Sequence, residues 1–172
     1  MFFSFSFLWD LQAVAITPRD SDGWYNVGGV AKAQGKVQEA IDAYYTSYHI
    51  NADDWELCYN LGVALGDEKR FEEEVKMYYE SIAINPKHKG TWANLGIAHA
   101  MGGDLVKAEP AFQEAVKLDP HDGQAWFNLA MALDKLGRKD EAKVALERAQ
   151  RLGVGGAPPK PTEIVYEEIE DF

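Results

Sequence analysis

Four asparagines recur at the same place in four similar pentapeptides. They lie in WYNVG, CYNLG, WANLG and WFNLA, each 34 residues after the one before: Asn26, Asn60, Asn94 and Asn128. An asparagine amide both donates and accepts hydrogen bonds, although inside a helix asparagine costs roughly half a kcal/mol relative to alanine. A row of amides, one per repeat, can therefore bind the backbone of an extended peptide. Two alternatives stay open: the asparagines are solvated residues inherited by duplication, or they hydrogen-bond the next repeat.

Residues suited to catalysis or metal binding form no recognisable motif. The histidines include no pair four residues apart and no HExxH sequence: His49, His88, His99 and His121. The glycine-rich stretch 28–36 lacks the G-K-[ST] ending of a phosphate loop. Cys58 stands where other repeats have tryptophan, which indicates a small buried side chain, and His99 falls on a core-facing position. The sequence predicts no catalytic residue, no cofactor and no metal.

The composition limits the class of protein. The chain has 172 residues, 47% of them hydrophobic, which suits one globular unit or one short repeat array. A net charge of −11 argues against nucleic acid or an anionic membrane as the main partner. The single cysteine allows no internal disulfide, so we expect the cytoplasm or another reducing soluble compartment, including an organelle interior.

Membrane insertion is not expected from the hydropathy pattern. No apolar run approaches the roughly 20 residues that span a bilayer. The start of the chain, MFFSFSFLW, is apolar but has no basic residue before Arg19, so we expect neither a signal peptide nor a transmembrane helix. Membrane contact is expected only through this N-terminal segment.

Other positions follow the same 34-residue step as the asparagines. One column is small and another is bulky: Gly28, Gly62, Gly96 and Ala130, then Tyr44, Tyr78, Phe112 and Leu146. Glu74 breaks a column of alanines and is expected to loosen its repeat, while the run Glu72, Glu73 and Glu74 is expected to be a solvated face at a helix start. Pro110 falls inside a predicted helix, where it should kink the helix or delay its start.

Together these columns resemble the tetratricopeptide repeat, a helix–turn–helix of 34 residues. The resemblance covers about 21–153 and implies an all-α, right-handed solenoid of four repeats: 21–54, 55–88, 89–122 and 123–153. Residues 1–20 are expected to hold a partial repeat, because AVAITPRD at 13–20 aligns with SIAINPKH at 81–88. Residues 154–172 are expected to form a Gly/Pro linker and an acidic tail.

The resemblance also implies a concave groove that binds protein segments. At about 100° per residue, Asn26 lies roughly 150° from the core side of its helix, so the asparagine column is expected to face this groove. Neighbouring columns share that face, and the predicted groove comprises Asn26, Asn60, Asn94, Asn128, Tyr25, Tyr59, Phe127, Val63, Ile97 and Met131. This surface predicts an extended or helical partner segment with apolar anchors.

One well-known subtype of this family, the clamp for the acidic tails of chaperones, is not expected. Such clamps use three basic residues and two asparagines at fixed positions. In the first possible frame these positions hold Tyr25, Gly29, Asn60, Gly90 and Asn94, and in the second they hold Tyr59, Val63, Asn94, Gln124 and Asn128. Each frame keeps only the middle asparagine, so the cations that would pair with carboxylates are missing.

The function predicted first is a non-catalytic adaptor or scaffold that binds a partner segment in the concave groove. The alternative is a structural subunit or assembly factor of a larger complex, including a membrane-associated one. Such a subunit would dock through its two ends, for which the candidate residues are Phe3, Phe5, Phe7, Trp9, Ile164, Tyr166 and Phe172. A third hypothesis is a fragment or accessory domain of an enzyme whose catalytic part lies on another chain.

Overall fold

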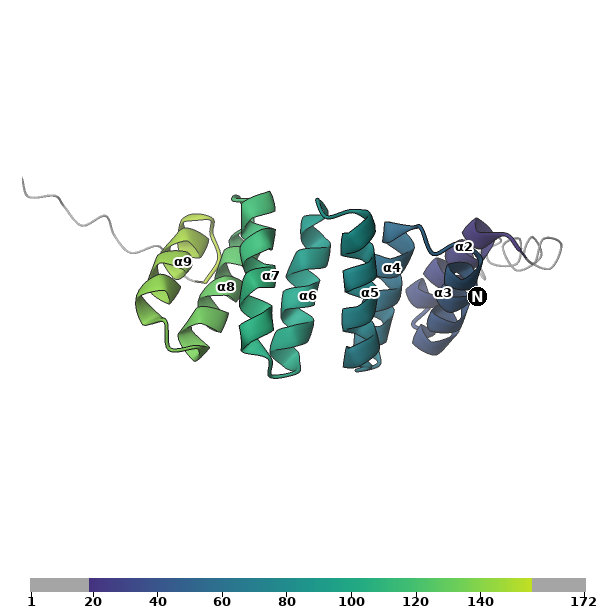
Figure 1. Ribbon diagram of the computed structural model, residues 1–172, viewed down its shortest axis with the longest axis horizontal. Helices are drawn as coiled ribbons and strands as arrows, with labels where there is room; N and C mark the ends of the chain where they lie inside the picture. The colour runs from purple at the N-terminus through teal and green to yellow at the C-terminus, as the bar shows by residue number, and fades with distance from the viewer. Residues whose placement is uncertain (1–18, 156–172) are drawn as a thin grey trace, which may run out of the picture.

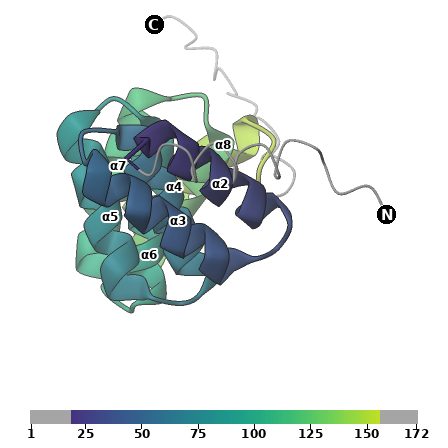
Figure 2. The same cartoon turned by 90° about the vertical axis from the view of Figure 1, so that its right-hand side faces the viewer.

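Four helical hairpins stack in a row. The computed structural model describes residues 19–155, and within them it contains eight helices and no strand. Figure 1 shows the helices side by side along the long axis, and Figure 2 views the row from the end formed by α2 and α3. The helices are α2 Ser21–Ala33, α3 Val37–Ile50, α4 Trp55–Asp67, α5 Phe71–Ile84, α6 Lys89–Met101, α7 Leu105–Leu118, α8 Gly123–Lys135 and α9 Lys139–Arg151. The predicted all-α architecture is confirmed.

Helix boundaries repeat with the same period as the sequence. The first helices of the hairpins begin at 21, 55, 89 and 123, and the second helices begin at 37, 71, 105 and 139. Aspartate side chains cap α4, α7 and α8 by accepting from backbone N–H groups of the first turn. The turn inside each hairpin has one residue with positive φ, which is glycine in three repeats and Lys69 (φ 60°) in the second.

An aromatic ring packed on a glycine closes each of the first three hairpins. A Cβ atom added to Gly28 or Gly96 would lie 2.5 Å from a ring carbon of Tyr44 or Phe112. The same atom on Gly62 would lie 2.6 Å from the ring of Tyr78. Only a residue without a side chain lets the two helices approach this closely. The fourth hairpin has Ala130 and Leu146 at these positions, so a smaller aliphatic side chain accompanies the added methyl group.

Contacts between successive hairpins differ between their first helices and their second helices. Each helix packs mainly on its neighbours in the chain, but α4 also contacts α6, and α6 contacts α8. Among the described helices, no two second helices of successive hairpins approach one another to the same extent. From the second hairpin onward the first helices are therefore closer together than the second helices, so they form the inner, concave side of the array.

Pro110 does not have the predicted effect on the start of its helix. Helix α7 begins at Leu105, in register with α3, α5 and α9, and continues through Pro110. Proline removes the hydrogen bond to the carbonyl four residues earlier, that of Val106. Both residues are exposed at the surface, so water can replace the missing donor. The prediction of a delayed start was wrong because the proline lies on the solvent side.

No helix in the described part of the chain is long and apolar enough to cross a membrane. Each of these helices has 13 or 14 residues. The N-terminal aromatic segment lies outside residues 19–155, as do the candidate residues of the acidic tail.

The ring-on-glycine contact predicts a specific pattern of mutant stabilities. Gly96→Ala should lower the free energy of unfolding by about 1 to 2 kcal/mol, because overpacking against Phe112 outweighs the gain in helix propensity. Combining it with Phe112→Leu reproduces the pair found in the fourth hairpin and should recover part of the loss. Urea unfolding of both single variants and the double variant measures the coupling. Additive losses would contradict the contact.

Candidate functional site

Two hollows lie on the concave side, at the junctions between successive hairpins. The central hollow, of about 270 Å³, lies between the second and third hairpins and is lined by Val63, Gly66, Asp67, Phe71, Glu74, Tyr78, Asn94, Ile97 and Met101. The C-terminal hollow, of about 320 Å³, lies between the third and fourth hairpins and is lined by Ile97, Ala100, Met101, Leu105, Phe112, Asn128, Met131, Ala132 and Lys135. Ile97 and Met101 belong to both hollows, so the two form one continuous surface.

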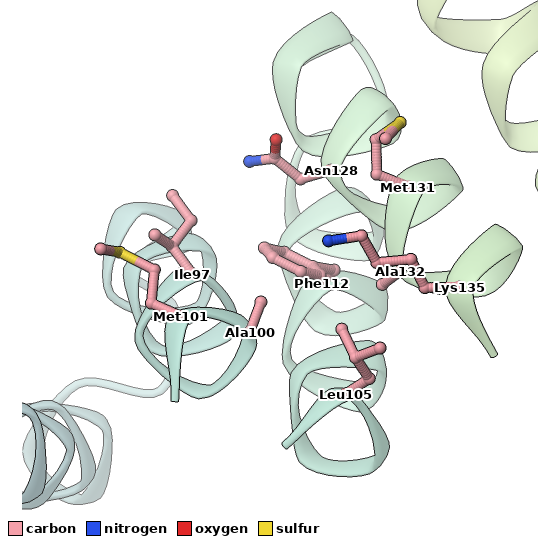
Figure 3. Close-up of a pocket in the computed structure, with 9 residues that line it drawn as sticks. All are labelled: Ile97, Ala100, Met101, Leu105, Phe112, Asn128, Met131, Ala132 and Lys135. Carbon is pink, nitrogen blue, oxygen red and sulfur yellow. The ribbon is translucent and has the colours of Figure 1, made fainter. Parts of the chain in front are cut away.

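The two hollows are copies of one another along the repeat. Most lining positions of the central hollow reappear 34 residues later in the C-terminal hollow, including Tyr78 as Phe112 and Asn94 as Asn128. Figure 3 shows the C-terminal hollow with Ile97 and Met101 of α6 on one side, residues of α8 on the other, and Phe112 between them. The ring that closes a hairpin thus also forms the floor of the hollow beside it.

Five of the predicted groove residues come together in these hollows. They are Asn94, Asn128, Val63, Ile97 and Met131. The sequence reasoning missed Met101, Leu105, Phe71, Phe112, Tyr78 and Lys135, which also line them. The 34-residue step itself could have found these residues, since 67, 101 and 135 form one column and 71 and 105 form another.

The asparagines at the second and third positions are hydrogen-bonded between repeats. Asn60 Nδ2 donates to Tyr25 Oη over 2.8 Å, and Asn94 Nδ2 donates to Tyr59 Oη over 3.3 Å. In each pair the tyrosine belongs to the preceding repeat, 35 residues earlier. These bonds connect neighbouring repeats, but the alternative expected a bond to the next repeat and the partner lies in the preceding one.

The two end asparagines differ from the middle ones. Asn26 is exposed, and Asn128 Oδ1 accepts a hydrogen bond from Gln124 Nε2 over 3.0 Å within the same helix. The first and second repeats have Tyr25 and Tyr59 in this column, but the third repeat has Ala93, so no hydroxyl stands there for Asn128. The asparagine column therefore has three different environments despite its regular spacing.

The remaining aromatic groove candidates pack within the array. Tyr25 and Tyr59 are half-buried against the rings of Tyr44 and Tyr78, with ring centroids 5.8 and 6.2 Å apart. Burial is the main reason that the pKa of Tyr25 is raised. Phe127 lies beside Gly155, where an added Cβ would be 3.1 Å from its ring. These aromatics support the walls of the array rather than the floor of a hollow.

Glu74 is the unexpected member of the site. It was expected on a solvated face with Glu72 and Glu73, but Glu74 is only 7% exposed, and its carboxylate lies over Gly66 in the central hollow. Its Oε2 atom is buried and has no hydrogen-bond partner among the described residues. Burial raises the pKa of Glu74, while a hydrogen bond with the Tyr78 hydroxyl opposes that shift. The expectation was wrong because this helix position faces inward, where the other repeats have alanine.

The two hollows carry opposite charge. Glu74 and Asp67 contribute carboxylates to the central hollow, whereas the C-terminal hollow has Lys135 as its charged lining residue. Asp67 also pairs with Lys32 of the first hairpin at 4.0 Å. A ligand lying along both hollows would therefore meet an acidic and then a basic environment.

The end of the last hairpin is partly covered by the chain itself. After α9 the backbone turns at Gly153, and Val154 packs on the start of α8, where an added Cβ on Gly123 would lie 2.9 Å from the Val154 side chain. Residues 153–155 thus lie against the last hairpin, where Gly155 also approaches the side chains of Phe127 and Leu146. The predicted docking residues of both termini lie outside the described residues.

Groups with possible chemical reactivity are packed in the core. Burial raises the pKa of the Cys58 thiol to about 11, so the thiol is protonated at neutral pH. His99 is buried and shares a hydrogen bond with the Tyr79 hydroxyl over 3.1 Å. Within residues 19–155, no group of three or more His, Cys, Asp or Glu side chains has the geometry to hold a metal ion.

A comparison with protein families identifies a related group. Residues 10–158 match the family described as the cilia and flagella-associated protein 70 C-terminal domain, a tetratricopeptide-repeat family. No curated protein sequence matches the chain.

Solved structures with the same fold include several tetratricopeptide proteins. MamA is 19% identical with a TM-score of 0.81, and the match covers 83% of this chain and 84% of MamA. YrrB, described as a tetratricopeptide protein with an unusual peptide-binding site, is 18% identical with a TM-score of 0.77 over 84% of this chain and 74% of YrrB. PilF of Pseudomonas aeruginosa is 18% identical with a TM-score of 0.75 over 86% of this chain and 67% of PilF. The predicted tetratricopeptide fold is confirmed.

Replacing the buried carboxylate should stabilise the protein. Glu74→Ala restores the residue of the other repeats and removes an unsatisfied buried oxygen, so the free energy of unfolding at pH 7 should rise by about 1 to 2 kcal/mol. The matched control, Glu72→Ala on the exposed side of the same helix, should change it by less than about 0.5 kcal/mol. Denaturant unfolding measures both, and equal effects would contradict the burial of Glu74.

This difference should depend on pH. Because the pKa of Glu74 is raised in the folded state, the folded protein keeps a proton that the unfolded chain releases above its ordinary pKa of 4.5. The free energy of unfolding of the wild type therefore falls relative to that of Glu74→Ala as pH rises above 4.5. The difference between the two free energies should shrink when unfolding is measured below that pH.

The inter-repeat hydrogen bond predicts non-additive losses. Tyr25→Phe and Asn60→Ala should each lower the free energy of unfolding by about 0.5 to 1.5 kcal/mol, because each removes one partner of the same bond. The double variant should lose less than the sum of the single variants. A purely additive result in thermal or urea unfolding would mean that this pair does not connect the repeats.

Proposed function

Because the chain belongs to the family of the cilia and flagella-associated protein 70 C-terminal domain, we propose that it is a non-catalytic adaptor that binds a protein segment along its concave side. A scaffold role in protein–protein interaction agrees with this family and with the tetratricopeptide fold. The binding surface consists of the central and C-terminal hollows together, and apolar anchors of an extended or helical partner segment enter it.

Exposed apolar side chains between the hollows are the observation that carries this proposal. Ile97 is 38% exposed, Met101 64% and Met131 44%, and all three line a hollow. Large apolar side chains gathered at a concave surface favour binding of another apolar group, because the contact removes them from water. Methionine adds to this, since its flexible thioether adapts to different partner shapes.

Polar groups beside these side chains suit a peptide backbone. Asn94 and Asn128 stand at equivalent walls of the two hollows and offer amide groups that can pair with backbone N–H and C=O. The description of YrrB as a peptide-binding tetratricopeptide protein supports the idea that an array of this fold takes a peptide. A segment with apolar anchors and an exposed backbone is the partner that this surface fits best. The acidic tail of a chaperone is not expected here, because the clamp cations are missing.

A second candidate function is a structural role in a ciliary or flagellar assembly. The description of the matched family refers to cilia and flagella, and this favours the candidate. In that case the chain would dock through its ends, for which the candidate residues are Phe3, Phe5, Phe7, Trp9, Ile164, Tyr166 and Phe172. The two candidates use different surfaces, so one set of variants separates them.

Charged substitutions in the hollows test the adaptor proposal. The double variant Ile97→Glu and Met131→Glu should lose at least about tenfold in affinity for a groove partner, because a charge cannot enter an apolar contact without losing its hydration. The control, Val106→Glu and Val144→Glu, places the same charges on exposed positions of α7 and α9. Affinity is measured by quantitative pull-down from ciliated-cell extract, with folding checked by circular dichroism.

Two outcomes separate the candidate functions. Partners retained by the control but lost by the hollow variant support binding in the groove. Partners that both variants retain, and that deletion of residues 1–18 or 156–172 removes, contradict the adaptor proposal and favour docking through the ends.

A further inference from the structure

We propose that the central hollow binds a basic side chain, Arg or Lys, of the partner segment, with Glu74 as its counter-charge. The inference rests on the proposed function, because it specifies which chemistry the groove selects. Glu74 stands where the other repeats have alanine, and it makes the central hollow different from the C-terminal hollow.

A carboxylate oxygen in the central hollow is unsatisfied. Glu74 is more than nine-tenths buried, lines the central hollow, and its Oε2 atom has no hydrogen-bond partner among the described residues. Its other oxygen lies over Gly66, where an added Cβ would be only 2.7 Å away. An unpaired buried acceptor destabilises the free protein, so a donor brought by a ligand gains more here than at a solvated carboxylate.

The lining of the hollow suits a cation. Asp67 adds a second carboxylate, and none of the nine lining residues is basic. Phe71 and Tyr78 offer aromatic rings, on which a guanidinium or ammonium group packs favourably. The amide oxygen of Asn94 is a further acceptor, since its Nδ2 already donates to Tyr59. The Lys32 ammonium, 4.0 Å from Asp67, comes from the first hairpin and is not part of the lining.

Other ligands fit less well. An acidic side chain would be repelled by Glu74 and Asp67. A divalent metal ion needs several oxygen ligands, and the part of the chain from 19 to 155 has no cluster of three or more acidic, histidine or cysteine side chains that could supply them. A side chain with its own forked or rotatable donors, as in Arg and Lys, satisfies a single carboxylate without such a cluster.

The neighbouring hollow fixes the register of the bound segment. Ala108 occupies the position of Glu74 in the next repeat and is fully buried, and Lys135 lines that hollow. A basic side chain is therefore favoured in the central hollow and opposed in the C-terminal hollow, where an apolar side chain meets Ile97, Met101 and Met131. A partner segment shifted by one repeat would bring its cation toward Lys135.

A peptide selection tests the inference directly. A phage library of random short peptides is panned on immobilised wild-type protein, on Glu74→Ala and on Glu72→Ala. Glu74→Ala is expected to fold because alanine stands at this position in the other three repeats, Ala40, Ala108 and Ala142. Glu72→Ala removes the same charge from an exposed position and so controls for general attraction of basic peptides to an acidic protein.

The expected result is an Arg or Lys at a constant spacing from an apolar residue in peptides selected on wild type and Glu72→Ala. Peptides selected on Glu74→Ala should keep the apolar residue and lose the basic one. A synthetic peptide from the wild-type selection should bind Glu74→Ala at least about tenfold more weakly. Replacing the arginine of this peptide by citrulline, a neutral analogue, should cause a similar loss of affinity for wild type and little loss of affinity for Glu74→Ala.

The failures of the two proposals can be told apart. Selected peptides that depend on Ile97 and Met131 but show no basic residue, or bind Glu74→Ala equally, overturn this inference and leave the groove function standing. A library that yields no peptide sensitive to Ile97→Glu and Met131→Glu overturns the groove function and this inference with it.

Discussion

The contact between an aromatic ring and a glycine at the centre of each of the first three hairpins determines the rest of the array. Tyr44, Tyr78 and Phe112 fill the space that a side chain on Gly28, Gly62 and Gly96 would need. This contact sets how closely the two helices of a hairpin approach. The same rings extend to the junction with the next hairpin, where Tyr78 and Phe112 form the floors of the two hollows. Packing and the candidate binding surface therefore share residues, so the hollow keeps its shape only while the hairpin is intact.

In the first two hairpins, serine hydrogen bonds also join the two helices at one end of the hairpin. Ser47 Oγ donates to the backbone carbonyl of Ser21 over 2.8 Å, and Ser81 Oγ donates to that of Trp55 over 2.9 Å. Each serine thus holds the end of a second helix to the start of the first helix in the same hairpin. In the third and fourth repeats the corresponding positions hold Ala115 and Ala149, both buried. The first two hairpins are therefore held by polar ties where the last two rely on apolar contact.

Much of the fold could be predicted from the sequence because a 34-residue period fixes several positions at once. Small, bulky and turn residues recur together, so the helix boundaries follow the period closely. The burial of Glu74 could not be predicted in this way. A charged residue in an alanine column can be buried or exposed, and the sequence does not show that Gly66 leaves room for its carboxylate. The bond between Asn94 and Tyr59 joins residues of different repeats, and its geometry depends on how one hairpin is rotated against the next. Pro110 was misjudged because periodicity does not show which carbonyls face water.

A repeat array copies one surface several times, so its selectivity must come from the positions that break the pattern. Equivalent positions of the two hollows hold similar residues, such as Tyr78 and Phe112 or Asn94 and Asn128. Such positions cannot distinguish one register of a bound segment from another. Glu74 and Lys135 do distinguish them, because they place opposite charges in neighbouring hollows. The carboxylate is buried at the cost of folding stability, and that cost is confined to a single hairpin. A residue that weakens the free protein at one point of a regular surface is best explained by the group that it binds there.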